Sequence, residues 1–197
     1  MKKLAIHPGI SFGAKFTKEQ LQILSKYVAD ATEVELTNFQ QLYIEVEDDQ
    51  VEDVSAKFEA AGLNTYPVGL YVKTLRTCNF CQGAEEEGMD VAIELNRRIA
   101  GKSVPFPLRP AYTGCPNACG EPLVHDIGVV KIGETFSVYL GGKAKGLDAQ
   151  MATLYKENLT EEGLYHACES VIENYEKHGK KREHFSKFLK RFGVENL

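Results

Sequence analysis

Two closely spaced pairs of cysteines constrain this chain more than any other feature of its sequence. Cys78 and Cys81 form the first pair, in the segment CNFC, and Cys115 and Cys119 form the second, in CPNAC. Four thiols in two short segments suit a tetrahedral metal site or an iron–sulfur cluster. Each pair follows a strand-like or extended segment, and the helix expected between them would return the chain to the same edge of a sheet. We therefore expect the two pairs to meet.

Three other uses of these cysteines stay open at this point. A structural zinc site favours two C-x2-C pairs separated by roughly 15–20 residues, whereas here one pair is C-x3-C and the gap is longer. Four free thiols would make poor use of this spacing, and a redox-active dithiol at CNFC would leave the second pair unexplained. The chain has five cysteines, an odd number that argues against a disulfide framework. Cys168 lies in a helical pattern, and we interpret it as a small buried hydrophobic residue.

Charge and hydropathy exclude several classes of partner. The net charge is −5 over 197 residues, which does not favour binding to nucleic acid or to an anionic membrane. No apolar run approaches the roughly 18 residues that span a bilayer. The first residues contain no sustained apolar segment of the kind that signal peptides have. We therefore expect a cytoplasmic protein whose thiols stay reduced.

The first third of the chain has the pattern of a small α/β unit. The segment KLAI favours a short strand, and residues 17–29 have helical spacing, with Thr17 and Gln20 placed as a capping box. Residues 32–47 alternate well enough for one or two strands, and residues 48–63 indicate a helix. The order strand, helix, strands, helix is typical of a ferredoxin-like half-domain.

The rest of the chain predicts a mixed α/β unit. In chain order we expect a linker that leads into a strand, a helix with a solvated acidic first turn, an irregular proline-rich segment, a hairpin that turns near Gly133 and continues into a glycine-rich loop, and two helices. The corresponding ranges are 64–77, 82–101, 102–114, 127–146, 161–179 and 182–194.

The segment TGCPNACGEPLVHDIGVV is the most distinctive motif in the sequence. It resembles the sirohaem and [4Fe–4S] signature of the nitrite and sulfite reductase family. Every signature position is filled, by Thr113, Gly114, Cys115, Cys119, Asp126, Ile127, Gly128 and Val129. The N-terminal third is similar to the family's ferredoxin-like half-domain, YLGGKAKG to its glycine-rich loop and REHFSKFLKRFGV to its C-terminal helix.

This resemblance implies a fold and a cofactor set. The fold class is α+β, with a ferredoxin-like half-domain over residues 1–66 followed by a mixed α/β sirohaem and [4Fe–4S] domain over residues 67–197. In the family, four cysteinates hold a [4Fe–4S] cluster, and one of them also bridges to the sirohaem iron. By position Cys119 would be the bridging residue. The four ligands would be Cys78, Cys81, Cys115 and Cys119.

The resemblance also implies residues that contact sirohaem or substrate. Sirohaem carries many carboxylates, so basic side chains and backbone N–H groups are expected around it. The expected cofactor contacts are Lys15, Arg76, Thr113, Gly114, Asn117, Gly141 and Gly142. The residues expected to face the substrate or the haem carboxylates, and so to act in catalysis, are Arg109, Lys73, Lys143 and Lys145.

Two departures from the family pattern bear on activity. The first cysteine pair is C-x2-C here, whereas the family usually has C-x5-C. Of the four basic residues that hold the substrate anion in the family, two align with the uncharged Phe39 and Pro107. Each lost charge-assisted hydrogen bond is worth roughly 1.5–3 kcal/mol, so we expect weaker binding of sulfite or nitrite.

The resemblance implies an anaerobic iron–sulfur oxidoreductase, most simply with sirohaem. It would pass electrons from a donor such as a ferredoxin, through the cluster, to a small inorganic anion on the haem. The alternative is a non-catalytic electron-transfer or tetrapyrrole-binding protein that keeps the cluster but has lost the anion site. Because family members carry two such halves in one chain, we expect this chain to form a homodimer.

Overall fold

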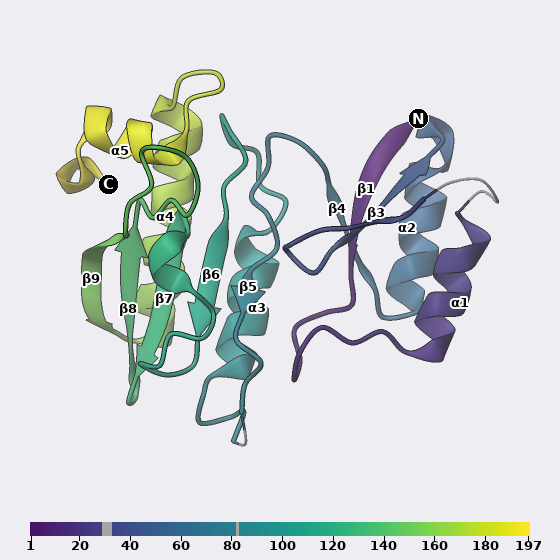
Figure 1. Cartoon of the computed structure of the whole chain (residues 1–197), viewed down its shortest axis with the longest axis horizontal. Helices are drawn as coiled ribbons and strands as arrows, with labels where there is room; N and C mark the ends of the chain where they lie inside the picture. Colours follow the sequence, from purple (N-terminus) through teal and green to yellow (C-terminus); the bar gives the residue numbers. More distant parts are fainter. Residues whose placement is uncertain (29–32, 82) are drawn as a thin grey trace. The chain divides into compact units, whose positions relative to one another are not determined.

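The structure, a computed structural model, describes residues 1–28, 33–81 and 83–197, which divide into two compact units, Met1–Val68 and Gly69–Leu197. Figure 1 shows the chain from its N-terminus to its C-terminus. Three residues of the predicted elements lie outside the described residues, namely Ala29, Thr32 and Gln82.

The first unit is an antiparallel sheet of four strands in the order β2-β3-β1-β4. Its two α-helices lie side by side on one face of this sheet (Figure 1). The elements are β1 (Lys2–His7), α1 (Lys18–Lys26), β2 (Glu35–Leu36), β3 (Leu42–Val46), the 3-10 helix η1 (Asp48–Gln50), α2 (Val51–Ala60) and β4 (Asn64–Pro67). The ferredoxin-like arrangement expected from the sequence is confirmed.

Local sequence explains this unit. The Thr17 hydroxyl accepts a hydrogen bond from the Gln20 N–H, and the Gln20 side chain accepts one from the Thr17 N–H, so the predicted capping box forms. A buried apolar cluster then holds the helices on the sheet. It consists of Leu4, Ile6, Leu24, Ile44, Val46, Val54, Phe58 and Leu63.

The second unit is a mixed sheet of five strands in the order β5-β6-β7-β8-β9. The first three strands are parallel, and β8 and β9 are antiparallel to their neighbours. The strands are β5 (Arg76–Thr77), β6 (Pro110–Thr113), β7 (Ile127–Ile132), β8 (Thr135–Leu140) and β9 (Thr153–Leu159). The helices are α3 (Met89–Ile99), α4 (Glu161–His178) and α5 (Phe185–Phe192), with the 3-10 helices η2 (Pro122–Val124) and η3 (Val194–Asn196).

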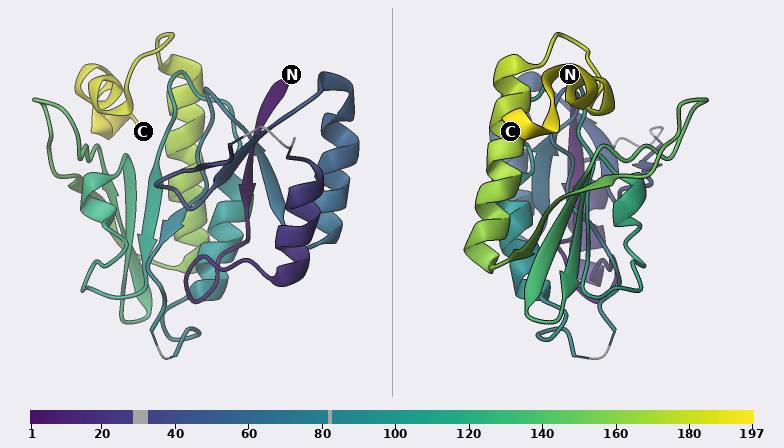
Figure 2. Two further views of the ribbon diagram at one scale, coloured as in Figure 1. Left: turned by 45° about the vertical axis from the view of Figure 1, so that its right-hand side comes forward. Right: turned by 90° about the vertical axis from the view of Figure 1, so that its left-hand side faces the viewer.

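The two faces of this sheet are covered differently. Helix α4 packs on β8 and α3, whereas η2 packs on β6, β7 and β8. The right-hand view of Figure 2 shows α4 on one face of the sheet and the segment of η2 on the other. One face is therefore covered by helices, and the other by η2, which follows the second cysteine pair in the chain.

Several predicted elements are confirmed. The hairpin of β7 and β8 pairs Ile132 with Thr135 and so turns at Gly133-Glu134. The glycine-rich loop follows β8, and α4 and α5 lie within the two predicted C-terminal helices. Cys168 is fully buried on α4, and burial raises the pKa of its thiol to about 12. No helix in the described ranges is long and apolar enough to cross a membrane.

Three expectations for the local structure were wrong, and one strand was missed. Residues 64–77 are not simply a linker, because Asn64–Pro67 pairs with β1 as an edge strand. Helix α3 begins only at Met89, because Gly88 before it is left-handed at φ +68°, so the acidic run lies in a turn. Within the segment expected to be irregular, Pro110–Thr113 is a buried strand, with proline at its first position. Strand β9 was not predicted.

Candidate metal centre

The two cysteine pairs lie at the carboxyl ends of two parallel neighbouring strands. Cys78 directly follows β5, Cys115 follows β6 by two residues, and α3 lies in the connection between these strands. The N–H of Cys78 donates to the Tyr112 carbonyl at 3.2 Å, and the N–H of Gly114 lies 3.4 Å from the Cys78 sulfur. The expectation that this crossover brings the pairs together is confirmed.

Phe80 anchors the first cysteine segment. Its side chain is only 2% exposed, and its ring stacks on that of Tyr112 with centroids 6.0 Å apart. Its backbone is left-handed, at φ +43°, a conformation that costs a non-glycine residue roughly 1–2 kcal/mol. This turn buries Cys78 and leaves Cys81 exposed. The buried ring therefore holds the two cysteines in different environments.

The second cysteine segment is a tight turn. The Ala118 N–H donates to the Cys115 carbonyl at 3.2 Å, and Ala118 is left-handed at φ +56°. Cys115 is half-buried and Cys119 is exposed. Gly114 packs so closely on Glu87 that an added Cβ would lie 2.5 Å from the Glu87 Cβ. The glycine expected to contact a cofactor therefore also has a packing role.

Glu87 acts directly on the first cysteine pair. Its Oε2 atom accepts a hydrogen bond from the Cys81 N–H at 3.0 Å. The Glu87 carboxylate raises the pKa of the Cys81 thiol, and burial and the thiols of Cys115, Cys119 and Cys78 raise it further. The other three cysteines therefore lie close enough to Cys81 to act on it electrostatically.

The surroundings of the cysteines fit an iron–sulfur cluster. The N–H of Gly114 points to a sulfur, and the Asn117 and Cys119 N–H groups have no acceptor within the described ranges. The buried Thr113 hydroxyl likewise has no hydrogen-bond partner there. Among the described residues, no three His, Cys, Asp or Glu side chains are arranged to hold a single metal ion. A four-iron cluster does not need such convergence, because each thiolate binds a different iron.

Two of the expected basic residues pair with acidic residues of the segment after the second cysteine pair. Arg76 forms an ion pair with Glu121 at 2.9 Å. Arg109 donates to Asp126 through its side-chain Nε at 3.0 Å and through its backbone N–H at 2.9 Å. Burial raises the pKa of Asp126, and the contact with Arg109 opposes this effect. The signature aspartate therefore positions an arginine.

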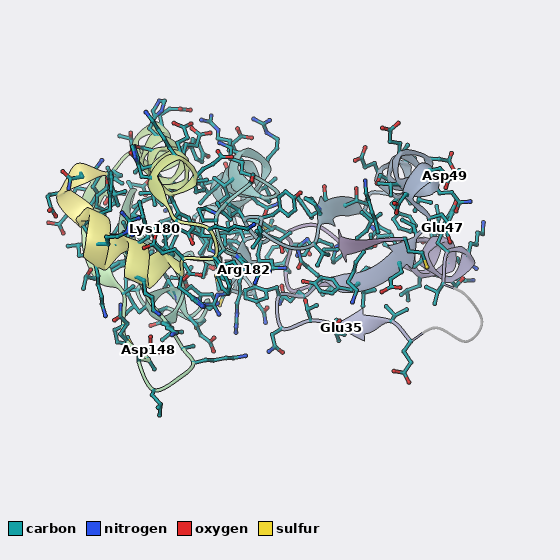
Figure 3. The ribbon with its side chains drawn as sticks, turned by 90° about the horizontal axis from the view of Figure 1, so that it is seen from above. Glu35, Glu47, Asp49, Asp148, Lys180 and Arg182 are labelled. Atoms are coloured by element: carbon teal, nitrogen blue, oxygen red, sulfur yellow. The ribbon has the colours of Figure 1, made fainter. Side chains whose placement is uncertain are left out.

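Within the second unit, the other expected basic residues do not gather at the cysteines. Lys73 and Arg109 precede β5 and β6, at the strand ends opposite Cys78 and Cys115. Lys143 pairs at 2.5 Å with Asp148, which lies in the long loop after β8 (Figure 3). Lys145 is exposed in the same loop. Lys15 is exposed in the first unit.

The remaining expected cofactor contacts have mixed surroundings. Asn117 is exposed at the tip of the second cysteine turn. Gly142 packs against the His125 and Leu123 carbonyl oxygens, which would lie 2.5 and 2.7 Å from an added Cβ. Gly141 is left-handed at φ +83° and accepts a hydrogen bond from Gln150. Close packing at Gly142 and the left-handed backbone at Gly141 therefore explain why glycine occupies these two positions, whether or not a cofactor binds there.

Sequence reasoning missed two residues of this region. Glu87 was interpreted as part of a solvated helix turn, although its spacing from Cys81 was visible. His125 is buried, its Nδ1 lies 2.7 Å from the Glu121 carbonyl, and burial lowers the pKa of its ring. The hydrogen bond to the Glu121 carbonyl opposes this shift, and the charges of Arg76 and Arg109 add to it. The position of His125 directly before the signature residue Asp126 is the sequence feature that could have identified it.

Comparison with known proteins places this site in a family. Residues 71–197 match the family model described as "Nitrite and sulphite reductase 4Fe-4S domain". Over 195 residues the chain is 29% identical to a cobalt-factor III methyltransferase of Priestia megaterium, covering 99% of this chain and 35% of that protein. Over 83 residues it is 37% identical to the sulfite reductase [NADPH] hemoprotein beta-component of Staphylococcus carnosus, covering 42% of this chain and 14% of that protein.

The fold has a counterpart among solved structures. Dissimilatory sulfite reductase I superimposes with a TM-score of 0.72 at 15% identity, covering 98% of this chain and 67% of that one. This likeness supports the expected α+β fold class. The chain spans about a third or less of the length of the curated relatives described above. The family-model match covers most of the chain and contains both cysteine pairs. The chain therefore belongs to the nitrite and sulfite reductase 4Fe-4S domain family.

Proposed function

We propose that this chain holds a [4Fe–4S] cluster through Cys78, Cys81, Cys115 and Cys119 and acts as an oxidoreductase of the nitrite and sulfite reductase type. The observation that carries the proposal is the meeting of the two cysteine turns at the ends of β5 and β6, with the Gly114 N–H directed at the Cys78 sulfur. Hydrogen bonds to sulfur and the net charge nearby tune such clusters.

We further propose that sirohaem binds beside the cluster. When bound, the pair would pass electrons from a protein donor to a small inorganic anion such as sulfite or nitrite. One carboxylate oxygen of Asp126 accepts both the backbone N–H and the side-chain Nε of Arg109, which would orient its guanidinium toward haem carboxylates or substrate. Arg76, Lys73, Lys143 and Lys145 are the further candidates for these contacts. A homodimer would supply the second half that two-half relatives carry in one chain.

The second candidate function is a cluster protein without reductase activity, either an electron carrier or a tetrapyrrole-binding protein. Phe39 and Pro107 replace two family cations, and Arg76, Arg109 and Lys143 already pair with carboxylates. One relative that matches 99% of this chain is named a methyltransferase and not a reductase, and the match covers 35% of that protein. These observations favour a protein that has kept the cluster and lost the anion site.

Anaerobic purification of the intact chain tests the cluster. We expect broad absorbance in the region of 400 nm with four irons and matching sulfide per chain, because four thiolates hold a four-iron cluster. Cys81→Ser should lose most of the iron, whereas Cys168→Ala should keep it, since Cys168 is buried on α4. A colourless protein with one zinc, or equal iron in both variants, would refute the proposal.

A second experiment separates the two candidate functions. Additional sirohaem bands and a fifth iron, with turnover of sulfite or nitrite, support the reductase. A cluster without haem supports the electron carrier, and haem without turnover supports the tetrapyrrole-binding protein. In a haem-containing protein, Phe39→Arg should raise turnover if the missing cation limits anion binding. Unchanged turnover would contradict that account of the anion site.

A further inference from the structure

We propose that the Glu87 carboxylate sets a low reduction potential for the iron–sulfur cluster held by the neighbouring cysteines. This inference rests on the proposed function. It adds Glu87, which the sequence pattern predicted to lie in a solvated helix turn. Glu87 touches a residue expected to bind the cluster, because its Oε2 atom accepts the Cys81 N–H at 3.0 Å.

The structure fixes Glu87 in this position. Its carbonyl accepts a hydrogen bond from the Tyr112 hydroxyl at 2.7 Å, and its N–H donates to the Gly83 carbonyl at 3.1 Å. On another side it packs against Gly114, where an added Cβ would collide with it. Tyr112 and Gly114 belong to the segment of the second cysteine pair, so both cysteine segments contribute to holding this carboxylate.

Two effects of Glu87 act in the same direction on the cluster. Reduction adds one electron to the cluster and its thiolates, and a fixed negative charge nearby disfavours that extra charge. Hydrogen bonds to cluster sulfur favour the reduced state, and Glu87 takes the Cys81 N–H for its own carboxylate. Both effects make reduction harder and lower the reduction potential.

The neighbouring glutamates provide a matched control. Glu85 and Glu86 lie on the same turn and carry the same charge, but both are exposed. No hydrogen bond joins either side chain to a cysteine within the described ranges. The replacement Glu85→Gln therefore removes one charge from the same turn without touching the cysteine segment. The replacement Glu87→Gln also removes one charge, and the amide oxygen can still accept the Cys81 N–H.

The test is a reductive titration of the anaerobic holoprotein with dithionite, followed by electron paramagnetic resonance. In Glu87→Gln we expect the equilibrium constant for one-electron reduction to rise on the order of tenfold, which is about 59 mV in midpoint potential. Glu85→Gln should shift it far less. Equal shifts in the two variants, or a shift of Glu87→Gln to lower potential, would overturn the inference.

Iron and sulfide analysis separates this inference from the proposed function. A wild-type protein without a cluster would refute both. A wild-type cluster with an unmoved potential in Glu87→Gln would refute only the role of Glu87. If Glu87→Gln fails to hold the cluster, Glu87→Asp decides, because its shorter side chain withdraws the charge from Cys81. Its potential should then rise, and an unchanged potential would overturn the inference.

Discussion

Asp126 holds Arg109 through a single carboxylate oxygen, which accepts both the Arg109 backbone N–H at 2.9 Å and its side-chain Nε at 3.0 Å. The Asp126 side chain is only 7% exposed, and that of Arg109 is 28% exposed. A buried carboxylate with two such donors is strongly coupled to its partner. The contact joins the residue that precedes β6 to the residue that precedes β7.

Replacing Asp126 with asparagine should destabilise the fold by roughly 1–3 kcal/mol, because a charge-assisted hydrogen bond is lost while Arg109 stays partly buried. Urea unfolding followed by circular dichroism measures the change. Asp148→Asn is the matched control, since its ion pair with Lys143 has an exposed carboxylate, and exposed pairs contribute only about 0–1 kcal/mol. Equal losses in the two variants would contradict the role assigned to Asp126.

Gly114→Ala should disturb the second cysteine segment. The new methyl group would lie 2.5 Å from the Glu87 Cβ and 2.6 Å from its carbonyl oxygen, and such overpacking costs about 1–3 kcal/mol. We expect a lower urea midpoint and lower iron content after anaerobic purification. Gly133→Ala is the comparison for iron content: no atom lies within 4 Å of the added Cβ, and the left-handed φ of +59° strains only its own hairpin turn, so its iron content should stay at the wild-type level. A Gly114→Ala protein with wild-type stability and iron would contradict this prediction.

Phe80→Ala should loosen the first cysteine segment. Removing a fully buried phenylalanine from a core costs about 3–5 kcal/mol, and here it also removes the stacking contact with Tyr112. Thermal unfolding and iron retention measure the two consequences. Phe12→Ala provides the comparison, because Phe12 is 47% exposed and should change neither quantity much. Full iron retention in a destabilised Phe80→Ala protein would show that the ring supports the core but not the cysteine geometry.

The sequence alone was sufficient for the parts of the fold that depend on local pattern. The capping box of Thr17, the hairpin at Gly133 and the buried Cys168 all follow from spacing and residue type within a few positions. The meeting of the cysteine pairs also followed, because a crossover between parallel strands leaves little choice of geometry.

Features that depend on tertiary contacts could not be predicted in this way. The Pro110–Thr113 strand is read as irregular from its prolines, but its neighbours β5 and β7 pair with it on both sides. The ion pairs of Arg76 and Arg109 join residues far apart in sequence, so charge pattern does not reveal them. Glu87 was misplaced because left-handed Gly88 delays the start of α3.

Acid should destabilise the first unit through His7. This residue is 2% exposed, its Nδ1 accepts the Gly9 N–H at 3.0 Å, and burial lowers its pKa from 6.5 to about 4. Between those two pH values the unfolded chain binds a proton that the folded chain does not, so the free energy of unfolding falls as pH falls. Because each pKa unit corresponds to about 1.4 kcal/mol, the loss approaches about 3 kcal/mol near pH 4.

Urea unfolding at several pH values between 4 and 7, together with nuclear magnetic resonance titration of the His7 ring, measures this effect. His7→Gln should flatten the pH dependence in this range, because glutamine does not titrate there. His166→Gln should leave it unchanged, since His166 is exposed on α4. A His7 ring that titrates near 6.5 in the folded protein would show that its burial imposes no cost on the charged form.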